Sequence, residues 1–289
     1  FCALIFHKKN HKKMENISKE EKNELHPKQM LEDNYKTIKT TPEENSSPEF
    51  NYKATLLRHT YNLSPETINE VQESFKSYLN IFLAYIRTDK PESADYFQRV
   101  TLGRFFKKLF MLITFIIHPI NRDESLKQLN DMNDVTLCNT MLYEECREFF
   151  GLKSSLKPKK LEQEEWSLDE WGKNYWNFLH ALSILVQYEH QKDSNHPAMD
   201  YLALVMVNFH IILPCNICSV HYKERNPLVS ITLPILHGKD AIYVIYELHN
   251  IVRVTNGLVW FPIEKFMENW NLEILKSENI DVDITEPLS

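Results

Sequence analysis

Two cysteines separated by two residues, Cys215 and Cys218 in Leu-Pro-Cys-Asn-Ile-Cys, are the residues of this chain best suited to chemistry. The Cys-x-x-Cys spacing serves redox enzymes, zinc sites and haem attachment, so alone it leaves three chemistries open. On a helix both sulfurs lie on one side and can close a small disulfide ring. At a helix N-terminus the free amides and the helix dipole stabilise a thiolate, the reactive form. Pro214, directly before the pair, is suited to start such a helix.

The composition favours a mainly helical protein with one large or two medium domains. The 289 residues include only 5 Gly and are rich in Leu, Ile, Phe, Tyr, Glu and Lys. A net charge of −7 with mixed signs offers no basic face, so we expect no nucleic-acid partner. The longest apolar run, Leu109 to Ile117, is about half of what a membrane span needs. We therefore expect a buried helix there and no transmembrane segment.

The first half is expected to be a polar segment followed by a helical domain without flavin. Residues 1–54 are rich in Lys, Glu, Asn and Ser, lack an apolar period and are expected to be disordered. The helical domain covers residues 55–152 and ends at a polar linker over 153–164. Its expected helices span 65–86, 94–118 with a break near Gly103, 124–132 and 136–150. Ser64 is the N-cap of the first of these helices, and Gly151 ends the last.

The second half, residues 165–276, is expected to be a bundle of five helices around one core. No strand pattern is found, and residues 277–289 form a tail, so the predicted fold class is all-α. A capping box at Ser167-Leu168-Asp169-Glu170 opens the first helix. The expected helices span 167–188, 198–213, 215–225, 239–256 with Gly257 as its cap, and 263–276.

Gly172, Trp176 and His180 are spaced by four residues and share one stripe of the first of these helices. Glycine costs roughly 1 kcal/mol in a helix relative to Ala, so Gly172 indicates a close approach to the backbone. A large flat ligand would make such an approach, with Trp176 and His180 as aromatic neighbours. The alternative is that Trp176 and His180 are ordinary core residues, and that His249-Asn250 is an ordinary surface pair.

The order of these motifs strongly resembles the Erv/ALR family of FAD-dependent sulfhydryl oxidases. The matching pieces are Trp171-Gly172…Trp176…His180, Pro214-Cys215…Cys218…His221 and His249-Asn250-Ile251-Val252, and the match covers residues 166–272. The resemblance implies an FAD cofactor and the oxidation of dithiols in protein substrates, with molecular oxygen as acceptor and hydrogen peroxide as product. It also implies that Cys218 lies against the flavin while Cys215 meets the substrate.

The resemblance assigns further residues to the cofactor and none to a metal. It implies that Trp176, His180 and Gly172 surround the flavin, that His221 borders it, that His249, Asn250 and Trp270 lie at its adenine end, and that Lys265 reaches its pyrophosphate. Arg253 stands where the family has Asn, and its fork of donors suits phosphate. The sequence departs from the family at three other places: Leu258 replaces a common lysine, and Tyr246 and Ile263 replace a second disulfide.

The chain lacks an obvious second Cys-x-x-Cys that could shuttle electrons from substrates. Cys138 and Cys146 lie eight residues apart in an expected helix. Their Cα atoms would be about 12 Å apart, beyond the reach of a disulfide. We expect structural or free thiols there, and a substrate that meets Cys215 directly.

A helical half before an Erv-like half, with no thioredoxin-like sequence, resembles the viral sulfhydryl oxidases of the baculovirus type. In those proteins the first half resembles a degenerate oxidase module without flavin, and the protein is a homodimer. For a viral protein the implied location is the virion and the infected host cell, in its nucleus or cytoplasm.

Two other functions stay open at this point. A zinc-binding helical module would use Cys215, Cys218 and His221, with His210 or His249 as fourth ligand, but no second ligand pair has the usual spacing. A non-catalytic interaction module would have kept the fold and lost the flavin, and the retained cysteine pair argues against it. A thioredoxin-like enzyme is disfavoured because it needs a strand before its cysteine helix.

Overall fold

The computed structural model describes residues 51–85, 96–117, 122–134, 147–152 and 168–285. Helices hold 72% of them, and the described strands form one two-stranded sheet, which confirms a mainly helical protein. Contacts divide the chain into a main unit, Leu57–His249 with Pro262–Glu278, and a smaller unit whose described parts are 51–56, Asn250–Phe261 and 279–285. None of the described helices is long and apolar enough to span a membrane.

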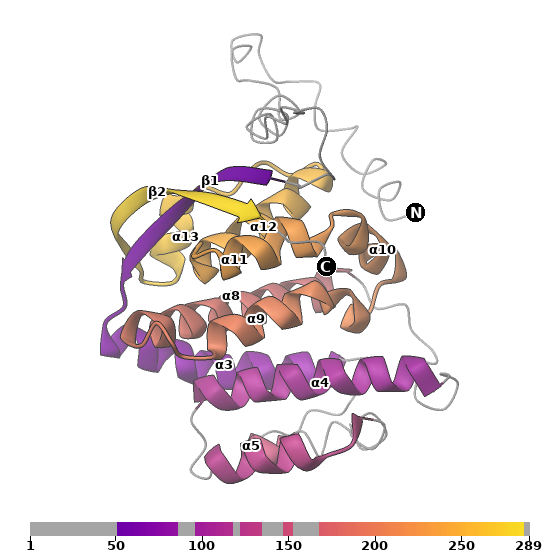
Figure 1. The fold of residues 1–289 in the computed structure, drawn as a ribbon. Helices are drawn as coiled ribbons and strands as arrows, with labels where there is room; N and C mark the ends of the chain where they lie inside the picture. Colours follow the sequence, from indigo (N-terminus) through magenta and orange to yellow (C-terminus); the bar gives the residue numbers. More distant parts are fainter. Residues whose placement is uncertain (1–50, 86–95, 118–121, 135–146, 153–167, 286–289) are drawn as a thin grey trace. The chain divides into compact units, whose positions relative to one another are not determined.

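The first half contributes to the main unit the helices α3 (Pro65–Tyr85), α4 (Tyr96–Ile117) and α5 (Arg122–Asp131), shown in purple to magenta in Figure 1. Ser64 begins α3 as predicted, since its hydroxyl accepts the Thr67 N–H at 3.2 Å. The expected break at Gly103 is wrong, because α4 is continuous there. A Cβ at Gly103 would lie 1.9 Å from the Asp134 carbonyl oxygen, so this glycine permits a close backbone approach.

Three other predictions for the first half lie mostly or wholly outside the described residues. Gly151 has a φ of +61°, and its N–H donates to the Glu148 carbonyl while the Leu152 N–H donates to the Arg147 carbonyl. This paired arrangement is a Schellman cap, so a helix ends at Gly151 as predicted. Most of the expected helix over 136–150, the linker over 153–164 and nearly all of the polar segment 1–54 lie outside the described residues.

The second half follows the predicted order of helices with shorter elements in places. Its described elements are α8 (Leu168–Lys192), α9 (Ala198–Val207), a 3₁₀ turn η1 (Phe209–Ile212), α10 (Asn216–Glu224), a π turn η2 (Leu228–Thr232), α11 (Leu233–Leu236), α12 (Ala241–Thr255) and α13 (Ile263–Asn269). In the smaller unit Gly257, at a φ of +77°, ends α12 as predicted. The two short elements η2 and α11 were not predicted from the sequence.

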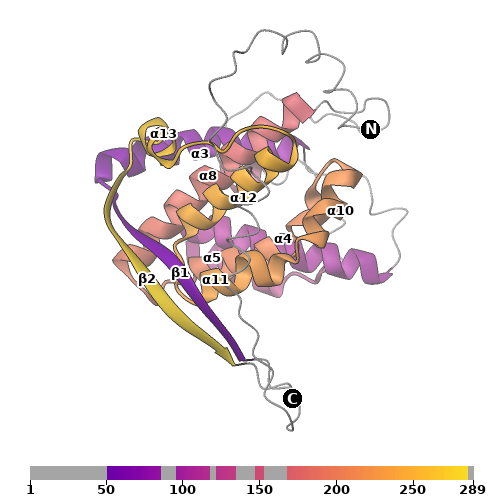
Figure 2. The same ribbon diagram turned by 90° about the horizontal axis from the view of Figure 1, so that it is seen from above.

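Helices from the two halves share one core in the main unit. Helix α3 packs along α8, and α4 packs along α9, as Figures 1 and 2 show. Phe82 of α3 and Phe178 of α8 are fully buried, with their ring centroids 3.9 Å apart and their planes 10° apart. Phe75 stacks on the same Phe178 at 5.5 Å. The helices before and after the predicted linker therefore bury their aromatic side chains against one another.

The prediction of no strands was wrong. Strands β1 (Asn51–Asn62) and β2 (Glu273–Thr285) pair as an antiparallel ribbon, seen side by side in Figure 2. In the main unit the Arg58 guanidinium bonds to Glu278, and the His59 imidazole lies 2.8 Å from the Ser277 hydroxyl. The last helix was expected to reach residue 276 but ends at Asn269, and Asn271 then adopts a φ of +51°. This left-handed residue turns the chain from helix into strand.

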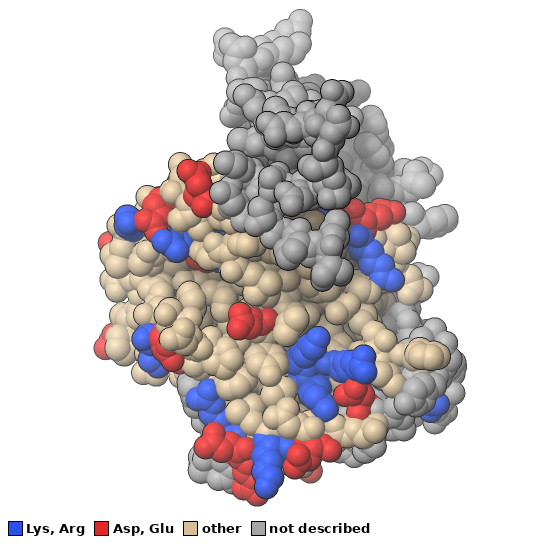
Figure 3. Space-filling view, viewed as in Figure 1, with Lys and Arg blue, Asp and Glu red and all other residues tan. Residues whose placement is uncertain are grey.

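The charged side chains visible on the face drawn in Figure 3 carry both signs. Lys and Arg side chains lie beside Asp and Glu side chains, and uncharged areas separate these groups. Exposed ion pairs of the main unit, such as Arg104–Asp134 at 3.0 Å, contribute little to stability, and others, such as Lys107–Asp134 at 3.4 Å, are partly buried. The core therefore carries the stability of the main unit.

Phe82→Ala tests whether the two halves fold on a shared core. We expect a loss of about 3–5 kcal/mol in the free energy of unfolding, because the substitution empties a fully buried ring site. Urea unfolding of the full chain measures it. The matched control is Phe97→Ala, since Phe97 is 78% exposed and its removal should change stability by less than about 0.5 kcal/mol. Equal effects of the two variants would contradict the shared core.

Candidate functional site

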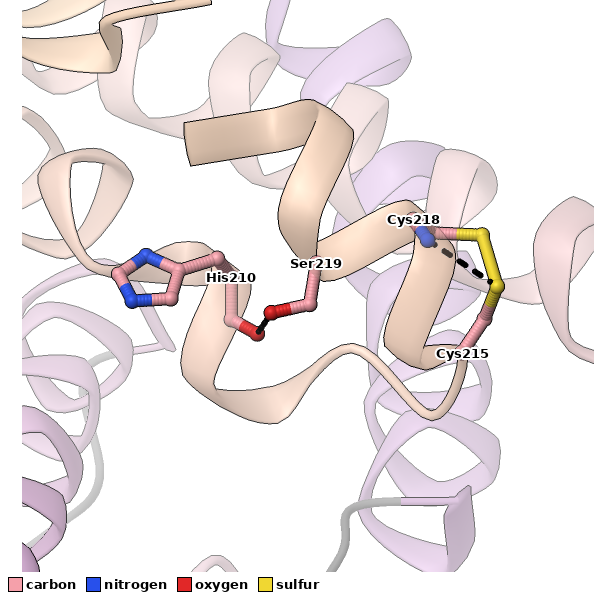
Figure 4. Close-up of a disulfide and its surroundings, with 4 residues drawn as sticks. All are labelled: His210, Cys215, Cys218 and Ser219. Atoms are coloured by element: carbon pink, nitrogen blue, oxygen red, sulfur yellow. Dashed lines mark hydrogen bonds between the residues drawn. A yellow bond between two sulfur atoms is a disulfide. The ribbon is translucent and has the colours of Figure 1, made fainter. Parts of the chain in front are cut away.

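The cysteine pair lies at the start of α10. Cys215 is the N-cap residue, with an extended backbone, and the Cys218 N–H donates to the Cys215 sulfur at 3.2 Å. Pro214 therefore precedes the N-cap and does not occupy the first helical position that the sequence suggested. The two sulfurs form a disulfide, with the Cα atoms 5.2 Å apart (Figure 4). The spacing of the pair thus closes the small ring expected of a helical Cys-x-x-Cys.

The surroundings of the disulfide hold α10 firmly while leaving the pair partly open to solvent. The Ser219 hydroxyl donates to the His210 carbonyl at 3.0 Å (Figure 4). The buried Tyr222 hydroxyl donates to the Met206 carbonyl at 2.5 Å. Both bonds tie α10 to the segment that precedes it. Cys215 and Cys218 are half-buried, and the neighbouring Ile217 is exposed. A dithiol in solution can therefore reach this disulfide.

The start of α10 also favours the Cys215 sulfur as a leaving group. The amide of Cys218 is one of the free N–H groups of the first turn, and it points at the Cys215 sulfur. This hydrogen bond and the positive end of the helix dipole stabilise negative charge on that sulfur when the disulfide opens. The local backbone is thus arranged for thiol–disulfide exchange.

A second cluster, here called the ring cluster, joins α8 to α12 and consists of Trp176, His180 and His249. The Trp176 and His249 rings stack with centroids 4.1 Å apart and planes 9° apart. His180 Nε2 lies 2.9 Å from His249 Nδ1, a hydrogen-bond distance. The predicted stripe of α8 and the predicted His249 therefore come together in one place. The described structure does not support the alternative that His249 is an ordinary surface residue.

Two aromatic residues of α13 and its end border the ring cluster. The Phe266 ring lies 5.0 Å from His180, and the Trp270 ring lies 6.3 Å from it. Phe266 was missed by the sequence analysis, although its position on the last helix, four residues before the predicted Trp270, puts both on one face. The cluster thus presents several ring faces and edges drawn from three helices.

His180 is the polar centre of the ring cluster. It is 4% exposed, and its Nδ1 atom is buried without a hydrogen-bond partner in the described structure. Burial lowers the pKa of His180 well below its ordinary value, and the neighbouring His249 adds to this. His180 is therefore a neutral imidazole with one ring nitrogen to offer. A buried nitrogen beside stacked rings suits a flat heteroaromatic ligand with its own polar edge.

The other predicted cofactor residues lie at different places. Gly172 is buried on α8, whereas His221 of α10 and Lys265 of α13 are exposed. In the smaller unit, the Asn250 amide donates to the Phe261 carbonyl at 3.2 Å and accepts the Phe261 N–H at 2.7 Å. Arg253 donates to the Val259 carbonyl at 3.3 Å. These two side chains hold the loop after α12, and their predicted contacts with a cofactor stay predictions.

A buried acidic network near the start of α12 was also missed. Asp240 is 1% exposed and accepts the Tyr61 hydroxyl, the His59 N–H and the Tyr243 N–H at 2.5, 2.8 and 2.7 Å. Burial raises the pKa of Asp240, and these hydrogen bonds oppose the rise. An aspartate directly before a helix is a recognisable N-cap, so the sequence held part of this signal. The hydrogen bonds of Asp240 attach β1 to the start of α12.

Two cavities lie in the main unit. One of about 500 Å³ is lined mostly by polar residues that include Arg58, His59, His190 and Lys239. The other, of about 310 Å³, includes Trp270 in its lining. Among the described residues, no three His, Cys, Asp or Glu side chains are gathered as metal ligands.

No known protein family, curated protein or solved structure matches this chain at significant similarity. The functional assignment therefore rests on the residues and on their geometry.

The buried state of His180 predicts a pH dependence of stability. Between the ordinary histidine pKa of 6.5 and its lower folded value, the unfolded chain binds a proton at His180 and the folded chain does not. Stability therefore falls as the pH drops below 6.5, by up to about 1.4 kcal/mol per pH unit from this group. Urea unfolding between pH 7.5 and 5 should show a shallower fall in His180→Gln.

The control for this experiment is Phe178→Leu, which alters a buried residue of the same helix without removing a titrating group. It should lower stability by a similar amount at every pH and keep the wild-type slope. Identical slopes in His180→Gln and in the wild type would contradict the buried neutral histidine.

Proposed function

We propose that this protein is an FAD-linked thiol oxidase of the Erv/ALR type, which forms disulfides in protein substrates and passes the electrons to oxygen. The observation that carries the proposal is the Cys215–Cys218 disulfide, half-exposed at the start of α10. Such a disulfide, with an amide directed at one sulfur, is built to exchange with thiols. A purely structural pair would gain nothing from this exposure.

The ring cluster supports a flavin as the partner of the disulfide. Trp176, His180 and His249 supply ring faces, and the buried Nδ1 of His180 supplies a polar atom without a protein partner. A flat heteroaromatic group with apolar and polar edges fits this set of residues better than a small or strongly charged ligand. His221 and Lys265, on α10 and α13, complete the residues that we propose for FAD in the main unit.

The exchange step needs only residues of this chain and the substrate dithiol. A substrate thiolate attacks the Cys215 sulfur, forms a mixed disulfide and displaces Cys218 as a thiolate. The second substrate thiolate attacks the substrate sulfur of the mixed disulfide, which closes the product disulfide and releases Cys215. The helix start stabilises this leaving thiolate. The pair has then gained two electrons, and the substrate has lost two electrons and two protons.

Bound FAD would accept these two electrons from Cys218 and transfer them to molecular oxygen, giving hydrogen peroxide. We propose that His180, the buried member of the ring cluster, faces a part of the cofactor from which water is excluded, because packed rings surround it. The described chain would thus separate a half-exposed disulfide, which meets protein dithiols, from a buried cofactor side.

We propose the viral, baculovirus-like type within this class, because helices of a large first half accompany the proposed oxidase half. We propose that α8, α9, α10, α12 and α13 form the Erv-like bundle, since they follow one another in the order of the five helices expected from the sequence. The close packing of α3 on α8 agrees with a first half that lies directly on the oxidase half. A homodimer, and a location in the virion and the infected cell, belong to the same proposal.

Cys218→Ser tests the exchange mechanism. We expect oxygen consumption with a dithiol to fall to the rate without enzyme, because a single sulfur cannot re-form the internal disulfide. An oxygen electrode measures turnover, and the flavin absorbance should be unchanged. Cys138→Ser is the matched control and should keep wild-type turnover. Full turnover in Cys218→Ser would refute the mechanism.

Trp176→Ala and His180→Ala test the cofactor side. Both should weaken FAD binding by about tenfold or more, a change of ~1.4 kcal/mol, because each removes a ring from the proposed site. The FAD content of the purified protein and fluorescence titration with FAD measure this. His237→Ala, at the end of α11, is the control and should retain the flavin. Unchanged flavin content in both test variants would show that the ring cluster is plain core, and a wild-type protein without flavin would favour the non-catalytic or zinc-binding module.

A further inference from the structure

The cavity of about 310 Å³ in the main unit is bounded by helices of both halves. Tyr78 and Ser74 of α3 form one wall, Asn177 of α8 a second, and Trp270 with Asn271 a third. Its volume lies at the lower end of the ~300–1,000 Å³ of small-molecule sites. Residues of α3 between 67 and 78 thus form over half of the described lining, and they lie outside the part of the sequence that resembles the Erv/ALR family.

Trp270 connects this cavity with the ring cluster. Its indole ring lies 6.3 Å from the His180 ring and also 6.3 Å from the Tyr78 ring, which meets it edge to face at 72°. Asn177 of the lining directly follows Trp176 in α8. Trp270 thus lines the cavity and also borders the ring cluster.

The lining suits an uncharged heterocycle and does not suit a phosphate. Trp270 and Tyr78 offer aromatic surface, on which a base can stack. Asn177, Asn269 and Asn271 bring side-chain amides, which form paired hydrogen bonds with the edge of adenine. Among the described residues, Glu70 is the one charged residue of the lining, and no Lys or Arg contributes to it. Phosphate groups would meet a negative charge here, while an exocyclic amine would meet an acceptor.

We infer that this cavity takes the adenine base of the dinucleotide and that α3 completes the site through Tyr78, Ser74 and Glu70. The inference rests on the proposed function, because it assumes that FAD is the cofactor. It gives the first half of the chain a direct part in cofactor binding, beyond its part in the shared core. Without α3, Trp270 would lose its aromatic neighbour Tyr78, and the base would lose one wall of its site.

Ser74→Phe tests the inference by filling the cavity from the α3 side. The full chain is stripped of flavin and titrated with FAD and with FMN, which carries the same isoalloxazine but no adenine. We expect FAD binding to weaken by about tenfold and FMN binding to change by less than about twofold, because only FAD reaches the cavity. Ser77→Phe is the matched control, since Ser77 is exposed on α3 and does not line the cavity. It should leave both affinities unchanged.

Tyr78→Ala is a second test that opens the cavity instead of filling it, and it too should weaken FAD more than FMN. Circular dichroism should show wild-type helix content in each variant that is compared. Unchanged FAD affinity in Ser74→Phe and Tyr78→Ala, or an equal loss of FAD and FMN, would overturn the inference while the proposed function stands. A wild-type chain that binds neither flavin would overturn both.

Discussion

The burial of aromatic rings along one face of α8 is the constraint on which the main unit depends. Phe178 lies between Phe75 and Phe82 of α3, and the Tyr175 hydroxyl donates to the Ile212 carbonyl just before the cysteine helix. These contacts fix the rotation of α8 about its axis. With 3.6 residues per turn, Trp176 and His180 then fall on another face, where His249 meets them. The core packing of the first half thereby sets the orientation of the ring cluster.

The two parts of the proposed site differ in burial, and this difference suits their roles. The disulfide is half-exposed at a helix start, where a thiolate is stabilised by free amides and the helix dipole. His180 is almost completely buried and neutral, so the ring cluster keeps a low-dielectric character in which polar contacts to a ligand are strong. A substrate could therefore be exchanged at the surface while the cofactor stays enclosed. The cavity lined by Trp270 lies between α3, α8 and the end of α13.

The sequence alone predicted most helices, the stripe on α8 and the reactive pair, because local rules determine them. Ser64 and Gly257 end helices by capping chemistry, and the spacing of Cys215 and Cys218 closes a helical disulfide. Contacts between distant segments carry no such local signal, so Phe266 and Tyr78 were missed. The strand β2 was misread as helix and tail because Asn271 takes a left-handed conformation that its type permits but does not require. The ribbon also depends on β1, more than 200 residues away in sequence.

The central claim is that electrons pass from a dithiol through Cys215–Cys218 to a flavin held by this chain. The most direct test is the absorption spectrum of the purified full-length protein, recorded without oxygen before and after a small dithiol is added. We expect a flavin band that bleaches with the dithiol and returns when oxygen is admitted. A flavin band that stays unchanged after the dithiol is added, or a colourless protein, would contradict it.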